Sequence, residues 1–147
     1  MHKHTPVNTY MTARPVTLLP EDTMQKAADI FKEAGFHHIP VVNADGHLSG
    51  MLSYTDYMRV MRSIYDTPAE KHEDDRYLNT VLVRDVMTKR HYLISLDVRA
   101  TLEDVVRLFR ANQFHALPVL DPQGKLAGIV TVHDLIKILS DHFLEIR

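Results

Sequence analysis

Apolar residues recur at helical spacing in two stretches of the 147-residue chain. One stripe consists of Met24, Ala27, Ala28, Phe31 and Ala34, and the other of Leu102, Val105, Val106 and Phe109. Residues three and four positions apart share one face of a helix, so each stripe predicts an amphipathic helix. Thr101 with Asp104 forms a capping-box pattern, at which the second of these helices is expected to begin.

Short apolar runs around these helices predict strands. The expected strands are Pro15 to Leu19 and Tyr92 to Leu96 before the helices, and Ile39 to Val42 and Leu117 to Leu120 after them. Each later run leads through a turn, Asp45-Gly46 or Pro122 to Gly124, into another strand that ends at Leu52 or Val130. A final helix is expected from Ser53 or Thr131, with these residues facing inward: Tyr57, Val60 and Met61, or Leu135, Ile138 and Leu139.

The same sequence pattern occurs twice. FHHIPVV (Phe36 to Val42) returns as FHALPVL (Phe114 to Leu120). Four residues after the end of each block, GHLSGMLSYTD (Gly46 to Asp56) returns as GKLAGIVTVHD (Gly124 to Asp134). The repeats therefore span residues 7–62 and 83–142. Residues 63–82 between them are expected to be a linker, because Thr67-Pro68 stops the helix and the stretch Ala69 to Arg76 is charged. A repeat of roughly 60 residues has little core of its own. We expect an α/β fold in which two β-α-β-β-α repeats pack with pseudo-two-fold symmetry as one domain.

Both repeats place Ser or Thr three residues before Asp at a predicted helix start, Ser53 with Asp56 and Thr131 with Asp134. One such box is often no more than a helix cap. Two boxes in register suggest more, because a helix N-terminus attracts phosphate and a carboxylate can accept both hydroxyls of a sugar diol. Gly50 and Gly128 just before them leave room for close approach. This combination indicates a nucleotide site.

The repeated Met-Thr pairs at Met11 and Met87, the His-x-x-Pro-Val segments and the Gly-x-x-Ser/Thr-x-x-Asp helix starts resemble a pair of CBS domains, which form a Bateman module. The resemblance covers nearly the whole chain. It implies a regulatory module that binds an adenine nucleotide (AMP, ADP or ATP) in clefts between the repeats. It also implies a homodimer, and an effector protein whose activity the module controls.

The resemblance also implies the site residues. Asp56 and Asp134 would hold ribose hydroxyls, and Ser53 and Thr131 would lie near phosphate or ribose. The other residues expected to line the clefts are Thr12, Arg14, His37, His38, Thr88, Arg90 and His115. Ala116 stands where the first repeat has His38, so phosphate is expected to bind better in the Asp56 cleft.

Composition narrows the alternatives. The net charge of −2 argues against nucleic-acid binding. The chain has no cysteine, no apolar run of membrane length and no secretory signal, so a soluble, cytoplasmic protein without a membrane anchor is expected. Its ten histidines show no metal-ligand spacing, and no metal is expected.

No nucleophile motif accompanies the Asp56 and His37 that could form an acid–base pair, so an enzyme is the least favoured reading. The main alternative to nucleotide sensing is a structural dimerisation module whose clefts stay empty.

Overall fold

The computed structural model describes residues 2–65, 77–112 and 114–144, and the chain forms two compact units. Val16–Leu93 form the Asp56 unit, and Met1–Pro15 together with Ile94–Arg147 form the Asp134 unit. Neither unit coincides with one sequence repeat. Most of the expected linker, including Thr67-Pro68, lies outside the described residues. Packing of the repeats as one domain stays a prediction.

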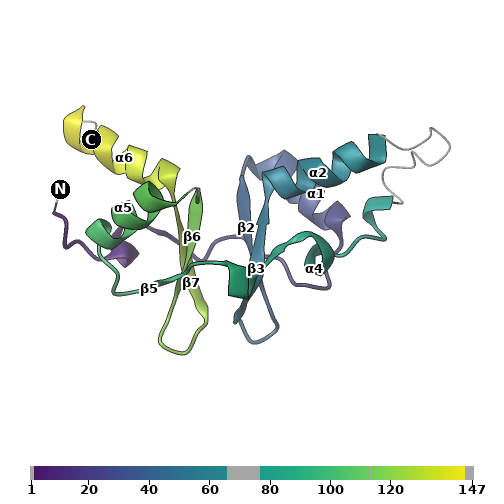
Figure 1. Cartoon of the computed structure of the whole chain (residues 1–147), viewed down its shortest axis with the longest axis horizontal. Helices are drawn as coiled ribbons and strands as arrows, with labels where there is room; N and C mark the ends of the chain where they lie inside the picture. Colours follow the sequence, from purple (N-terminus) through teal and green to yellow (C-terminus); the bar gives the residue numbers. More distant parts are fainter. Residues whose placement is uncertain (1, 66–76, 113, 145–147) are drawn as a thin grey trace. The chain divides into compact units, whose positions relative to one another are not determined.

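The Asp56 unit combines three antiparallel strands with two long helices. Its elements are α1 (Met24–Ala34), β2 (His38–Val42), β3 (Leu48–Ser53), α2 (Tyr54–Tyr65), α4 (Val83–Val86), β4 (Thr88–Lys89) and the 3-10 turn η3 (Arg90–Tyr92). The strand order is β2-β3-β4. Helices α1 and α2 contact each other beside this sheet (Figure 1).

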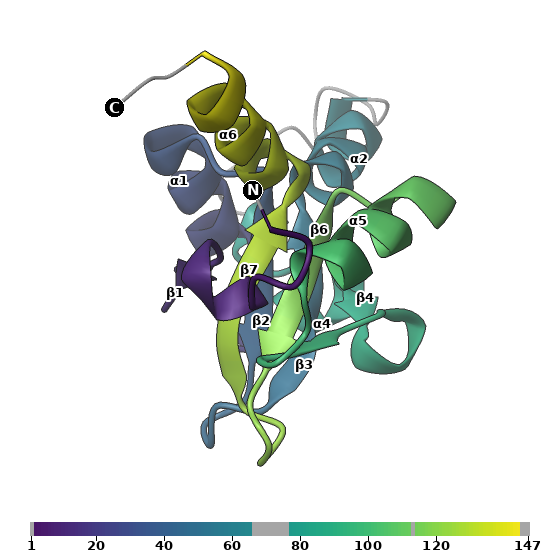
Figure 2. The same cartoon turned by 90° about the vertical axis from the view of Figure 1, so that its left-hand side faces the viewer.

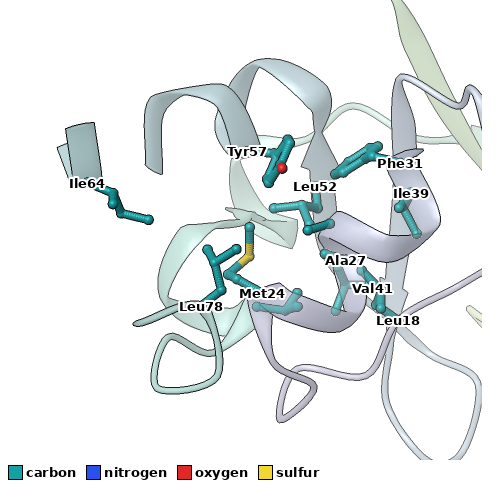
Figure 3. Packing of buried hydrophobic residues seen from close by; sticks show 12 residues of the cluster. Leu18, Met24, Ala27, Phe31, Ile39, Val41, Leu52, Tyr57, Ile64 and Leu78 are labelled. Carbon is teal, nitrogen blue, oxygen red and sulfur yellow. The ribbon is translucent and has the colours of Figure 1, made fainter. Parts of the chain in front are cut away.

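Local chemistry sets the ends of these elements. The Thr23 hydroxyl accepts a hydrogen bond from Lys26 N at the start of α1. Gly35 ends the helix with a φ of 65°, a left-handed conformation that favours glycine. Met24, Ala27, Ala28 and Phe31 are buried as expected, and they pack against Ile39, Val41, Leu52 and Tyr57 from the strands and α2 (Figure 3).

The Asp134 unit has a similar order of helices and strands, but its sheet has four strands. Its elements are η1 (Val7–Thr9), β1 (Thr12–Ala13), β5 (Leu96–Asp97), α5 (Leu102–Ala111), β6 (Ala116–Leu120), β7 (Leu126–Thr131) and α6 (Val132–Phe143), which continues from the end of β7 (Figure 2). The strand order is β1-β7-β6-β5, with only β5 parallel to its neighbour. The predicted capping box of Thr101 and Asp104 is confirmed.

Each sheet contains a strand from the other sequence repeat. β4, from the start of the second repeat, pairs with β3, so that Thr88 lies opposite Met51. β1, from the start of the first repeat, pairs with β7, so that Thr12 lies opposite Ile129. We call β1 and β4 the exchanged strands. They explain why the structural units differ from the sequence repeats.

Two predicted strands were wrong. In the segment Pro15 to Leu19 only Leu18 pairs, through one parallel bridge to Val41. Tyr92 belongs to a 3-10 turn, and of the segment Tyr92 to Leu96 only Leu96 lies in a strand, β5. Three predicted inward residues are also exposed: Ala34, Val106 (46% exposed) and Leu139 (43%).

Candidate functional site

Asp56 lies in the first turn of α2 and is 9% exposed, although it is an acidic residue. Its Oδ2 accepts a hydrogen bond of 2.9 Å from Ser53 N, and its own N–H donates to Ser53 Oγ at 3.0 Å. The predicted capping box therefore forms. The second carboxylate oxygen, Oδ1, lies 3.3 Å from Nη1 of Arg59.

Asp134 occupies the matching position in α6 and is half-buried. Its Oδ2 accepts hydrogen bonds from Thr131 N at 2.8 Å and from Thr131 Oγ1 at 3.1 Å. Asp134 N donates back to Thr131 Oγ1 at 3.2 Å. Within the described part of the chain no cation is paired with this carboxylate.

The histidine segments contact both helix starts through the backbone. His37 O accepts a hydrogen bond of 2.7 Å from Tyr54 N, and His115 O accepts one of 3.1 Å from Val132 N. With the amides of Asp56 and Asp134 used in the capping boxes, two of the first three helical N–H groups are satisfied internally. The amides of Thr55 and His133, which lie between them, have no acceptor among the described residues. Each helix start therefore keeps one N–H group that can donate to an anion.

The other predicted site residues divide between the two units. His38 lies opposite Ser53 across the β2–β3 pair, and Ala116 lies opposite Thr131 across β6–β7. The exchanged strand β4 brings Thr88 and the exposed Arg90 into the Asp56 unit, whereas β1 brings Thr12 and Arg14 into the Asp134 unit. Each unit therefore contains a carboxylate, a hydroxyl-capped helix start and an arginine.

Gly50 and Gly128 lie against other parts of the protein, so the space beside them is not free for a ligand. A Cβ at Gly128 would lie 2.6 Å from Met11 Sδ and 2.7 Å from Thr12 O. A Cβ at Gly50 would collide with Thr88 O and lie 2.8 Å from Met87 Sδ. The glycines thus accommodate the backbone of the exchanged strands, and the interpretation that they admit a ligand was incomplete.

Arg14 has a strained backbone. Its φ of 51° is the only positive φ found at a non-glycine residue in the described ranges. The left-handed region is unfavourable for residues with a Cβ, and such strain often accompanies functional positions. Arg14 follows β1 directly in the chain, and its side chain is exposed.

Two residues of the Asp56 unit were missed by the sequence analysis. Arg59 pairs with Asp56, and the i,i+3 spacing of opposite charges could have indicated it. Tyr54 is 39% exposed, and its ring lies 5.7 Å from both Phe31 and His37. Val132 stands at the matching position of the Asp134 unit, so the surroundings of the two carboxylates differ.

The described residues also bear on metal binding and on membrane insertion. They contain no group of three or more His, Cys, Asp or Glu side chains that could hold a metal ion. None of the helices in those same ranges has the length and apolar character needed to cross a membrane.

Comparison with known proteins agrees with the repeat. The family model described as CBS domain matches residues 7–63 and 83–141. Inosine-5′-monophosphate dehydrogenase of Aquifex aeolicus is 28% identical over 127 residues, which are 86% of this chain and 23% of that protein. The chain thus spans about a quarter of the length of this curated relative.

Solved structures share the fold. CBSX2 in complex with AMP is 24% identical with a TM-score of 0.77, and the match covers 94% of this chain and 98% of that one. A CBS domain pair in complex with 5′-methylthioadenosine and S-adenosyl-L-methionine is 19% identical with a TM-score of 0.75, over 94% and 98% of the two chains.

Proposed function

The chain belongs to the CBS domain family, and from this premise we propose that it is a regulatory module that binds adenosine-containing nucleotides such as AMP, ADP or ATP. One observation carries the proposal most directly. In each unit, a capped carboxylate stands in the first turn of the helix that follows β3 or β7, and this strand pairs with an exchanged strand that carries a threonine and leads into an arginine.

The chemistry of this arrangement suits a nucleoside phosphate. A carboxylate accepts hydrogen bonds from neighbouring ribose hydroxyls, so Asp56 and Asp134 are the proposed ribose ligands. The open amide at each helix start would donate a hydrogen bond to phosphate, and Arg90 or Arg14 would neutralise its charge. The bound ligands of the two structural relatives, AMP in one and two adenosine derivatives in the other, support an adenosine-containing ligand here.

Binding would regulate by shifting a conformational equilibrium. A ligand changes a population only as far as it binds one state more tightly than the other. The activity under control would belong to an effector, either a separate protein or another domain of a longer chain. We keep the prediction that the chain itself is not an enzyme.

Native mass spectrometry of freshly purified protein tests the proposal, because it reveals a copurified ligand and the number of subunits together. AMP, ADP and ATP should also raise the melting temperature, since a ligand that binds only the folded state stabilises it. A protein with no copurified adenosine compound, whose melting temperature is unchanged by all three nucleotides at millimolar concentration, would contradict nucleotide sensing.

The second candidate is a dimerisation module without a nucleotide, and it is favoured by the surface of α6. Ile136 (55%), Leu139 (43%) and Phe143 (71%) of this helix are exposed. We propose that this face joins two copies of the chain in a symmetric homodimer. On α2, Met58 is exposed in the same way, but Met61 packs partly against the core of its own unit. A dimer whose stability ignores nucleotides would support this candidate over sensing.

A further inference from the structure

The two candidate carboxylates differ in whether a basic side chain pairs with them. In the Asp56 unit, Arg59 lies one turn further along α2 and its Nη1 is 3.3 Å from Asp56 Oδ1. In the Asp134 unit, Lys137 occupies the equivalent position, three residues after the aspartate, and forms no ion pair with it in the described part of the chain. The repeats therefore offer a comparison within one molecule.

The two carboxylate oxygens of each aspartate have different partners. Oδ2 of each aspartate faces its own capping box, where it accepts from the backbone N–H of Ser53 or Thr131. Each carboxylate oxygen can accept two hydrogen bonds, and Oδ1 is the one that no capping-box group occupies, so it can accept both hydroxyls of a ribose diol. Arg59 holds this oxygen of Asp56, whose side chain is only 12% exposed, whereas Oδ1 of Asp134 has no cation beside it among the described residues.

We propose that Arg59 acts as a latch on Asp56: it must give up its hydrogen bond to Oδ1 before both hydroxyls of a ribose diol can bind this oxygen. This inference rests on the proposed function and adds a difference in selectivity between its two sites. The Arg59 side chain is 72% exposed, so it is able to swing away.

The latch makes the Asp56 site favour phosphorylated nucleosides. A plain nucleoside offers Arg59 no anion, so binding sacrifices the ion pair. A nucleotide offers its phosphate as a new partner, and guanidinium–phosphate hydrogen bonds are strong. The Asp134 site has no latch, so nucleosides bind there without this loss.

The test uses the full chain carrying Asp134→Ala, in which only the Asp56 site remains, and calorimetry with adenosine and AMP. Adding Arg59→Gln keeps a long polar side chain and removes the charge. Adenosine affinity should rise about two- to fivefold, the worth of an exposed ion pair, and the preference for AMP over adenosine should narrow. Arg59→Ala should give the same result.

Salt gives a readout that a purely structural role of Arg59 would not change. Raising NaCl from about 0.05 M to about 0.5 M screens exposed ion pairs. It should strengthen adenosine binding when Arg59 is present and leave it unchanged in Arg59→Gln. The matched control is Lys137→Gln in the Asp56→Ala protein, in which adenosine affinity should not change.

The outcomes separate the latch from the proposed function. Adenosine affinity that is unchanged or reduced by Arg59→Gln, in a chain that binds AMP, overturns the latch alone. Failure of the unsubstituted chain to bind either adenosine or AMP overturns the proposed function and the latch with it.

Discussion

At the scale of single residues, the two repeats place different side chains at equivalent points. His38 lies opposite Ser53, whereas Ala116 lies opposite Thr131 in the same register. Arg59 and Lys137 differ in the same way at the aspartates. Duplication therefore preserved the backbone and the capping boxes while the charged surroundings of the two sites diverged.

Substitutions at His38 and Ala116 test whether the two sites differ in phosphate binding. We expect His38→Ala to weaken AMP binding severalfold and to leave adenosine binding nearly unchanged, because a histidine contact to phosphate is charge-assisted. The reciprocal change Ala116→His should strengthen AMP binding at the Asp134 site. Calorimetry on the two variants checks both, and an equal loss for AMP and adenosine in His38→Ala would show that the residue acts through the fold.

Tyr10 is a residue at which the fold buries a polar group. Its hydroxyl is buried with no hydrogen-bond partner in the described ranges. Burial, with a smaller effect from the nearby charge of Asp104, raises the pKa of Tyr10 to about 12. The folded state thus favours the neutral phenol, and this contribution to stability is complete below pH 10 and lost as the pH rises from 10 towards 12.

The variant Tyr10→Phe should be at least as stable as the parent at pH 8, because it removes a buried donor that lacks a partner. Between pH 9 and pH 11 it should lose less stability than the parent. Tyr92→Phe is the matched control, since Tyr92 is 71% exposed. Urea unfolding at a series of pH values makes the comparison, and parallel curves for parent and Tyr10→Phe would show that the phenol is not held neutral.

At the scale of elements, the exchanged strands connect the fold to the site. Each has only two residues, and each crosses a glycine that has no room for a Cβ. The arginines that follow them, Arg14 and Arg90, are proposed phosphate ligands. Pairing of these short strands should therefore determine both stability and ligand affinity.

The changes Gly50→Ala and Gly128→Ala test this role. Each should cost about 1–3 kcal/mol of stability, as overpacking does, and should weaken nucleotide binding by displacing Thr88 or Thr12. Gly35→Ala is the control, because its φ of 65° makes an alanine strained while nothing lies within 4 Å. That variant should lose stability and keep its affinity. Normal nucleotide binding by Gly50→Ala would separate the exchanged strand from the site.

The sequence predicted what depends on local chemistry. The capping boxes at Ser53, Thr101 and Thr131 and the turn at Gly46 follow from spacings within one segment. The exchanged strands could not be predicted in this way, because each is too short for a period-two pattern and its partner lies in the other repeat. The Arg59 ion pair is predictable only in part: the i,i+3 spacing indicates it, but Lys137 has equal spacing from Asp134 and does not pair with it.

At the scale of the whole molecule, the two units bury the helices that carry their site aspartates differently. α2 buries Tyr57 and Ile64, whereas none of the residues 132–143 that form α6 is buried. Exposed apolar surface of this kind marks interaction sites. The proposed homodimer would cover the α6 face, and closed two-fold pairs are the commonest soluble oligomers.

Replacing Ile136 and Leu139 together by glutamate should therefore dissociate the dimer, because the two positions share one face of α6. Light scattering should give twice 16.9 kDa for the parent and 16.9 kDa for the variant. Lys137→Glu, on the same helix, controls for the added charge and should stay dimeric. A parent that is monomeric at micromolar concentration, with and without nucleotide, rules the dimer out.

The most direct test of the central claim is a calorimetric titration of AMP into the parent and into Asp56→Ala/Asp134→Ala. The parent should bind AMP, and the double variant should lose roughly 1.5–3 kcal/mol of binding free energy at each site, the worth of hydrogen bonds to a charged group. Asp104→Ala controls for the loss of a capping box, about 1 kcal/mol, because Asp104 caps α5 and belongs to neither site. AMP affinity that is lost in the double variant and kept in Asp104→Ala is the predicted result. Equal affinity of the parent and the double variant would contradict the account.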